Sequence, residues 1–280
     1  MRNFTLKTAV KFLFFAMIIS LLCFQGESIG LNPGNAGIDQ EQEAKKARLY
    51  KDVFPLITEA DLYCSFFVMD KMELEAQIVG SERDKERILL RESEIFYVNR
   101  GSAYGFEVGQ IYTILQVGEK ISVPITGKKY GRVVYRRGRA QIVSVEEDRA
   151  FAKLEKSCGE VMVGHFLVPF EEKSGLLGKD LGYDVSISEE EGSWGRLIYF
   201  QDDYQQISKG HYSIIDIGEE DGIHFGQQLV IYRKTKGKMG SIEKIGNSIV
   251  IDTRQKTSTV KILSSNNALK AGDFVQPRYK

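Results

Sequence analysis

The sequence is poor in the residues that most often hold metal ions or carry out catalysis. Among 280 residues it has three histidines, three cysteines and one tryptophan. His165, His211 and His224 stand far apart and have no partner at the spacing of metal ligands. No cysteine belongs to a C-x-x-C pair, and a catalytic thiol would need a histidine partner. The sequence therefore predicts a protein that is not an enzyme and has no metal site and no cofactor.

Only one long apolar run is present, and it lies near the N-terminus. It covers residues 12–24, follows three basic residues and precedes small residues that suit cleavage after Ser28. This order is typical of a cleavable secretory signal, so we expect residues 1–28 to be a signal peptide. The alternatives are an uncleaved anchor and a lipoprotein modified at Cys23. The run is shorter than the roughly 20 residues of a membrane span, and leucines rather than a small residue precede Cys23.

An excess of charge of either sign is also missing. The chain has 38 basic and 38 acidic residues, and removal of residues 1–28 leaves 35 and 37, a formal charge of −2. Such a chain has no global field to attract nucleic acid. We therefore expect an exported chain in the periplasm or outer cell envelope, with no nucleic-acid partner and no transmembrane span after processing.

Two cysteines, Cys64 and Cys158, remain once the signal is removed. An even pair in an oxidising compartment is a candidate disulfide. Cys64 lies in a strand-like segment, residues 61–70, and the bond would attach this segment to the first part of the chain. Because aromatic residues follow Cys64, a plain buried thiol is the alternative.

The sequence does contain a repeated, glycine-spaced segment. Residues 97–115 and 214–232 align without a gap at a shift of 117 residues. Further on, residues 138–169 align with 246–277 at a shift of 108, because the intervening loop is 9 residues longer in the first copy. A repeat of this length predicts a duplicated domain. The glycines shared by the two turns are Gly101, Gly105 and Gly109, and Gly218, Gly222 and Gly226.

Each glycine-spaced segment lies between two runs of β-branched and aromatic residues, which predicts strand, turn and strand. We expect the first glycine to end a strand, the second (Gly105 or Gly222) to adopt a positive φ, and the third to reverse the chain. A phosphate-binding glycine loop would require a helix to follow, and a strand follows here. Two apolar positions of each turn are expected to point inward under it: Phe106 and Val108, and Ile223 and Phe225.

The many short strands and turns predict an all-β protein with two tandem small β-barrel domains, SH3-like or similar. A short helix is expected over residues 37–53, with Asp39 as its N-cap. We place the boundaries as follows: signal peptide 1–28, N-terminal segment 29–63, first β-domain 64–170, linker 171–195 and second β-domain 196–280.

A run of arginines is the most distinctive polar feature of the sequence. Arg132, Arg136, Arg137 and Arg139 lie on one expected strand and form a candidate interaction patch; a solvated strand face is the alternative. The second copy has no such run, so the patch is not part of the repeated design. Trp194 stands near three aromatic residues, which favours packing, with stacking on a sugar as the alternative.

The segments "YVNRGSAYGFEVGQIYTIL" and "YGRVVYRRGRAQIVSVEEDRAFAKLEKSCGEVMVGHFLVP" resemble the C-terminal domain of the bacterial flagellar assembly protein T. They are also similar to the β-domains that follow LysM modules in some Gram-negative envelope proteins. The shared pattern is an apolar strand, the glycine turn, a return strand and a closing G-x-h-x-x-P, where h is apolar. The resemblance implies a small β-barrel with an assembly or scaffolding role and no catalysis.

The sequence thus favours a non-enzymatic, exported envelope protein that acts through contact with another envelope protein. The alternative is a module that binds peptidoglycan or another glycan.

Overall fold

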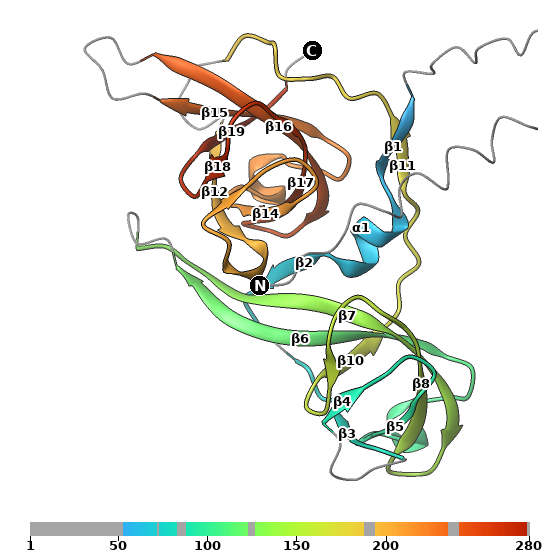
Figure 1. Ribbon diagram of the computed structural model, residues 1–280. Helices are drawn as coiled ribbons and strands as arrows, with labels where there is room; N and C mark the ends of the chain where they lie inside the picture. The colour runs from blue at the N-terminus through green and yellow to red at the C-terminus, as the bar shows by residue number, and fades with distance from the viewer. Residues whose placement is uncertain are drawn as a thin grey trace, which may run out of the picture. The chain divides into compact units, whose positions relative to one another are not determined.

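The protein is all-β, as the sequence predicts. A computed structural model describes residues 53–71, 73–82, 88–122, 127–187, 194–234 and 241–278, and strands dominate them (Figure 1). Among these residues the one α-helix is α1 (Glu59–Cys64), and none of their helices is long and apolar enough to cross a membrane. The residues from 50 onward form one compact unit. The expected signal peptide lies outside the described residues, as does the expected helix over 37–53 except for residue 53.

The described chain begins with a short strand, helix and strand. β1 (Phe54–Ile57) pairs antiparallel with β11 (Leu176–Gly178). α1 follows because Thr58 caps it: the Thr58 hydroxyl accepts from the Asp61 N–H, and the Asp61 carboxylate accepts from the Thr58 N–H at 2.7 Å. β2 (Phe66–Met69) then pairs with β7.

One sequence expectation is corrected in this region. Residues 61–64 are helical rather than strand-like, because the Thr58–Asp61 cap stabilises a turn of helix that strand propensity does not reveal. The stretch expected as a linker, residues 171–195, includes the short strand β11, which pairs with β1.

Residues 66–169 form a seven-stranded sheet that curls around a core. The strand path is β10-β6-β7-β8-β5-β3, with β2 added to β7. An isolated bridge between Gln77 and Phe166 links the two ends of this path. A separate pair, β4 (Leu89–Leu90) with β9 (Val161–Met162), lies beside it. The strands are β3 (Ile78–Ser81), β5 (Ile95–Val98), β6 (Ile111–Ser122), β7 (Lys129–Val145), β8 (Ala150–Ser157) and β10 (Phe166–Pro169).

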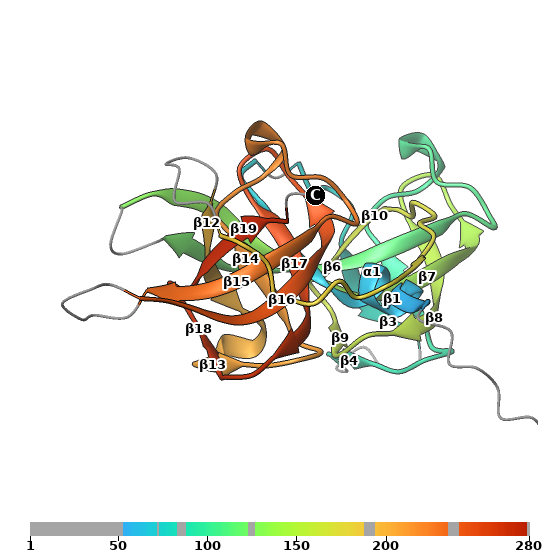
Figure 2. The ribbon, with the colours of Figure 1, turned by 90° about the horizontal axis from the view of Figure 1, so that it is seen from above.

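Residues 195–277 form a closed six-stranded barrel (Figures 1 and 2). Its path is β12-β14-β17-β16-β15-β19, and β12 pairs with β19 to close it. A short pair, β13 (Gln206–Ile207) with β18 (Leu269–Lys270), lies beside it. The strands are β12 (Gly195–Phe200), β14 (Tyr212–Ile215), β15 (Gln228–Lys234), β16 (Ile242–Thr253), β17 (Ser258–Ser265) and β19 (Phe274–Pro277).

The sheet and the barrel have the same strand order and the same interior positions. Pairs that the repeat aligns are fully buried in both cores, namely Ile142 and Val250, Leu154 and Ile262, and Leu167 and Val275. Side chains alternate between the inner and outer faces along each strand. β-Branched residues and leucines at every second position therefore all face the core, which favours a strand in these segments.

Candidate interaction surface

The two glycine turns have nearly the same backbone. Gly105 has φ +82° and Gly222 has φ +77°, each at the end of a single 3₁₀ turn: η1 (Ser102–Tyr104) and η3 (Glu219–Asp221). A Cβ on Gly101 would lie 2.2 Å from the Glu146 carbonyl oxygen, and a Cβ on Gly218 would lie 2.2 Å from that of Arg254. The first glycine of each turn is therefore needed for a close backbone approach, and the second for a left-handed conformation.

Both turns present an apolar side chain to solvent, and this corrects the sequence analysis. Phe106 and Ile223 point inward and are buried, but Val108 is 66% exposed and Phe225 is 44% exposed. The alternation of inward and outward residues holds for extended strand. Residues 107–110 and 224–227 instead form tight turns. They are closed by bonds from the Gln110 N–H to the Glu107 carbonyl and from the Gln227 N–H to the His224 carbonyl.

A groove lies beside Phe225. It encloses about 380 Å³ and is lined by Glu171, Lys173, Ser174, Phe225, Ile251, Asp252, Thr253 and Arg254. A second groove of about 300 Å³ shares Glu171, Lys173 and Arg254 with it and continues past Phe67 and Tyr63. The first groove has mostly polar and charged walls, and the second has mainly apolar ones. Together with the exposed Phe225 they form a candidate contact surface.

Arg136 does not belong to an exposed patch. Its side chain is buried, and its guanidinium donates to the Asp252 carboxylate at 2.6 Å and to the Ser65 hydroxyl at 3.1 Å. Burial lowers the pKa of Arg136, while the charge of Asp252 and its hydrogen bond act against that shift. Asp252 is itself buried and also accepts from Arg254 at 2.9 Å. Because Arg136 lies on β7 and Asp252 on β16, the pair joins these two strands.

The other three arginines of the expected patch each have a partner. Arg132 donates to the Gly118 carbonyl, Arg137 donates to Gln116 at 2.6 Å, and Arg139 donates to the Glu155 carboxylate at 2.9 Å. Successive residues of a strand point to opposite faces, so four arginines within eight positions do not form one surface. The expected patch is therefore not assembled as a common basic site.

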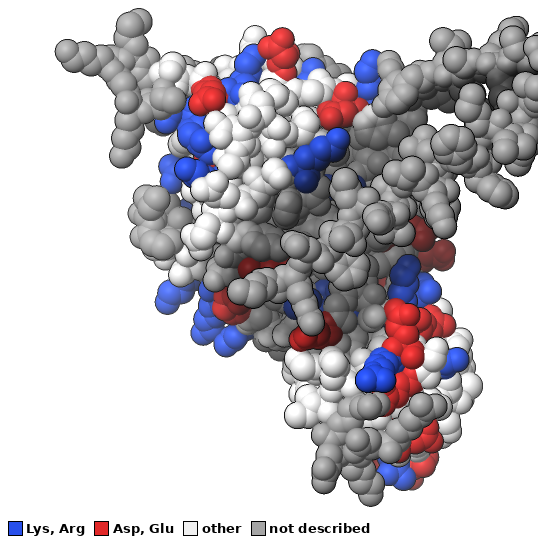
Figure 3. Space-filling view, in the orientation of Figure 1, with Lys and Arg blue, Asp and Glu red and all other residues white. Residues whose placement is uncertain are grey.

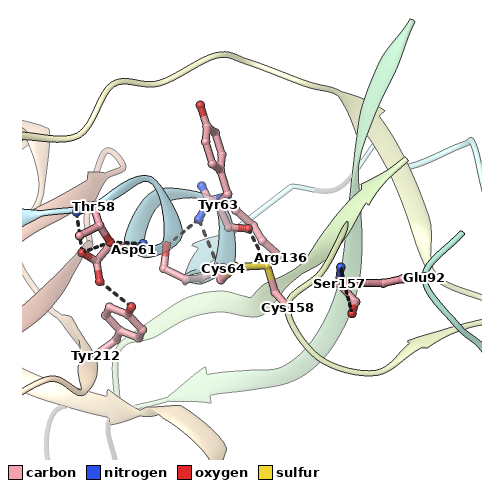
Figure 4. Close-up of a disulfide and its surroundings, with 10 residues drawn as sticks. Thr58, Asp61, Tyr63, Cys64, Glu92, Arg136, Ser157, Cys158 and Tyr212 are labelled. Carbon is pink, nitrogen blue, oxygen red and sulfur yellow. Dashed lines mark hydrogen bonds between the residues drawn. A yellow bond between two sulfur atoms is a disulfide. The ribbon is translucent and has the colours of Figure 1, made fainter. Parts of the chain in front are cut away.

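The disulfide between Cys64 and Cys158 is present in the structure, with 5.2 Å between the two Cα atoms (Figure 4). Cys64 ends α1, and Cys158 follows directly after β8. The Cys158 N–H donates to the Arg137 carbonyl, which fixes its backbone against β7. The bond therefore attaches the N-terminal segment to the first sheet.

On its other side, α1 is attached to the barrel through Asp61. The Asp61 carboxylate accepts from the Lys261 ammonium and the Tyr212 hydroxyl, both at 2.7 Å. Burial alone would raise the pKa of Asp61, but the bonds from Lys261, Thr58 and Tyr212 outweigh it and hold the pKa below its usual value. Desolvation and the neighbouring Asp61 raise the pKa of Tyr212. The tyrosine thus stays a neutral donor to an ionised carboxylate.

The three histidines remain separate from one another. His165 is buried, and its Nδ1 accepts from the Met162 N–H at 3.2 Å. Burial, with a smaller contribution from Arg137, lowers the pKa of His165 to about 4. Among the described residues, no group of three or more His, Cys, Asp or Glu is arranged to hold a metal ion.

Sequence reasoning missed three features of this surface. The helix α1 could have been found from the T-x-x-D capping pattern at Thr58–Asp61. The exposure of Val108 and Phe225 could have been found by treating "EVG" and "HFG" as turns rather than strand. The Arg136–Asp252 pair has no sequence signal, because its members lie 116 positions apart.

Comparison with known proteins adds no family: no family model and no curated protein matches this sequence.

Proposed function

We propose that this chain is an exported, non-enzymatic scaffold of the bacterial cell envelope, built from two tandem SH3-like barrels. The shared strand order of residues 66–169 and 195–277, and their aligned cores, support the tandem arrangement. The basic–apolar–small N-terminus supports export. The Cys64–Cys158 bond suits an oxidising compartment. The resemblance to flagellar assembly protein T and to domains that follow LysM modules supports an assembly role.

The observation that carries the proposal is the pair of exposed apolar side chains on equivalent rigid turns. Val108 and Phe225 occupy the same place in the repeat and are both exposed at the tip of a turn held by backbone hydrogen bonds. A large apolar side chain on a rigid support loses little conformational entropy on binding, and such residues often anchor protein interfaces. The groove next to Phe225 extends the contact area available to a partner.

Site-specific photo-crosslinking in the native bacterial host tests this role. A benzophenone amino acid at position 225 or 108 should give a discrete adduct with one envelope protein. The matched control places the same amino acid at Lys209, an exposed polar turn residue of the barrel. Adducts that are as frequent at position 209 as at 225, or no adduct at either turn, would reject the proposal.

The alternative function, binding to peptidoglycan or another glycan, is favoured by one observation. Trp194 packs edge-on against Phe274 with ring centroids 4.9 Å apart, and both rings remain partly exposed beside basic residues. Co-sedimentation with purified sacculi tests it: a peptidoglycan binder enters the pellet in proportion to the sacculi added, and a protein-contact scaffold does not.

A further inference from the structure

Five side chains gather on the outer face of the barrel where β12, β19 and β15 lie side by side. Arg196 is paired with Phe274, and Phe274 is paired with Tyr232, so the three share one row across the strands. Lys234 lies two residues beyond Tyr232 and therefore points to the same face. Trp194, immediately before β12, completes the group.

The rings form a fixed aromatic support. Phe274 stacks on the buried Tyr232, with centroids 5.4 Å apart and an angle of 16° between the planes. Trp194 meets Phe274 edge-on. Contact with the buried Tyr232 restricts the rotation of Phe274, and contact with Phe274 restricts Trp194. The two rings are therefore preorganised for binding.

Two cations converge on these rings. The Arg196 guanidinium lies 5.1 Å from the Phe274 centroid, and the Lys234 ammonium lies 5.2 Å from it. Both cations also lie within 6 Å of the Trp194 ring. Among the described residues, neither group forms an ion pair, whereas the neighbouring Arg233 is bound to Asp273 through two hydrogen bonds of 2.7 Å. Lys234 and Arg196 thus have no direct ion-pair contact that an external anion would have to displace, although Asp216 acts on Arg196 at longer range.

Other basic side chains lie on the same side of the barrel. On the face drawn in Figure 3, Lys and Arg gather at the left of the barrel, where β12, β15 and β19 lie in Figure 1. One acidic group lies beside the cluster: the Asp216 carboxylate accepts from the Arg196 backbone N–H at 2.5 Å, and Arg196 and Lys128 both act on it electrostatically. The carboxylate therefore balances part of the positive charge of these basic residues.

We propose that Arg196, Lys234, Trp194 and Phe274 form a binding site for an acidic glycan, a sugar polymer that carries carboxylates or phosphates. The two cations bind the acidic group, and the partly exposed rings of Trp194 and Phe274 give apolar contact area to the sugar. This proposal specifies the ligand class of the alternative function above. It is independent of Val108 and Phe225, so crosslinking at the turns and glycan binding can fail separately.

The single tryptophan of the chain makes the site directly measurable, because all tryptophan fluorescence comes from Trp194. Oligogalacturonate and phosphorylated dextran serve as the carboxylate and phosphate probes, and neutral dextran is the control polymer. We expect saturable quenching or a spectral shift with at least one acidic probe, none with dextran, and weaker binding as salt increases.

Matched variants then separate the site from general charge. Arg196→Gln and Lys234→Gln should each weaken binding about three- to tenfold, and together they should abolish it. Lys209→Gln removes an exposed lysine elsewhere on the barrel and should bind like the parent chain. Thermal melts check that each variant is folded.

Three results would overturn the proposal. One is the absence of any salt-dependent change with either acidic probe. Another is equal binding by the double variant and the parent chain. The third is a fluorescence change with anionic lipid vesicles but with neither glycan, which would assign the cluster to a lipid surface instead. Comparison of the two acidic probes decides whether carboxylate or phosphate is preferred.

Discussion

The barrel and the first sheet differ in the outer faces of two equivalent strand pairs, β16 and β17 in the barrel and β7 and β8 in the sheet. On the barrel, Ile249, Ile251 and Leu263 are buried beneath β1 and α1. The aligned residues of the first sheet are Gln141, Val143 and Glu155, which remain at least partly exposed. The turns and the cores are alike, but the outer faces are not.

This difference shows how a duplicated unit can acquire an asymmetric role. Interior residues and turn glycines are constrained by packing and backbone angle, whereas an outer face can change from polar to apolar without disturbing the core. The barrel uses the changed face to bind the N-terminal segment, and the first sheet attaches the same segment through a disulfide and through β2.

The largest expected effect concerns the buried pair that joins the two regions. Asp252→Ala should destabilise the protein by about 3–5 kcal/mol, because Arg136 is left buried without its counter-ion. The control is Glu155→Ala, which removes the partly exposed partner of Arg139 and should cost less than about 1 kcal/mol. Denaturant unfolding measures both. Equal losses would mean that the junction contributes no more than a surface ion pair.

Removal of the disulfide should affect the first sheet more than the barrel. The double variant Cys64→Ser, Cys158→Ser should lose about 2–4 kcal/mol, since the bond closes a loop of 94 residues in the unfolded chain. Hydrogen exchange should quicken in α1 and at the end of β8, while β14 and β17 keep their protection. Uniformly faster exchange throughout both regions would contradict the local role of the bond.

The glycine turns should respond equally in the two copies. Gly105→Val and Gly222→Val should each cost about 1–3 kcal/mol, through backbone strain alone, because a Cβ at either position has no heavy atom within 4 Å. Thermal melts of the two variants decide this. Gly80→Ala is the control, since its Cβ would meet only Tyr97 at 3.7 Å. A large effect in one copy and none in the other would break the equivalence of the turns.

A pH-dependent difference arises at one aligned position. The Met162 N–H donates to neutral His165 in the sheet, and the aligned Lys270 N–H donates to the Asp273 carboxylate in the barrel at 2.7 Å. The folded pKa of His165 is about 4 against 6.5 for the free side chain, so the unfolded state binds the proton more readily between these values. Stability from this site is complete above pH 6.5 and is lost as the pH falls toward 4.

The expected loss from His165 is about 2 kcal/mol between pH 7.5 and pH 5. Unfolding measured across this range should show a smaller slope for His165→Asn, which keeps an acceptor but cannot titrate. If the slope of His165→Asn matched that of the parent chain, His165 would not be the titrating group.

The smallest stability effects belong to the exposed turn residues. Val108→Ser and Phe225→Ser should change stability by less than about 0.5 kcal/mol, as expected of surface substitutions. The controls lie two residues earlier: Phe106→Ser and Ile223→Ser remove buried side chains and should cost at least about 2 kcal/mol. Melts that rank the two pairs in the opposite order would show that the turns are oriented differently.

The sequence was most informative where structure depends on local pattern. Alternating apolar residues predicted the all-β class, and glycine spacing predicted the positive φ of Gly105 and Gly222. It was least informative about contacts between distant residues. Nothing in the run around Arg136 indicates that this arginine is buried against Asp252 while Arg139 stays partly exposed, because the partner of each is chosen by the packing of the strands.

The contacts of the N-terminal segment have a consequence for the order of folding. Phe66 accepts a hydrogen bond from Thr259, Asp61 binds Lys261, and Leu56 accepts from Lys261, across sequence separations of 193, 200 and 205 residues. The pairing of this segment with β7 and its disulfide need only the chain up to Cys158, but its barrel contacts cannot form until Thr259 and Lys261 are available. Contacts so distant in sequence form slowly. The junction between the N-terminal segment and the barrel is therefore expected to be one of the last parts of the fold to form.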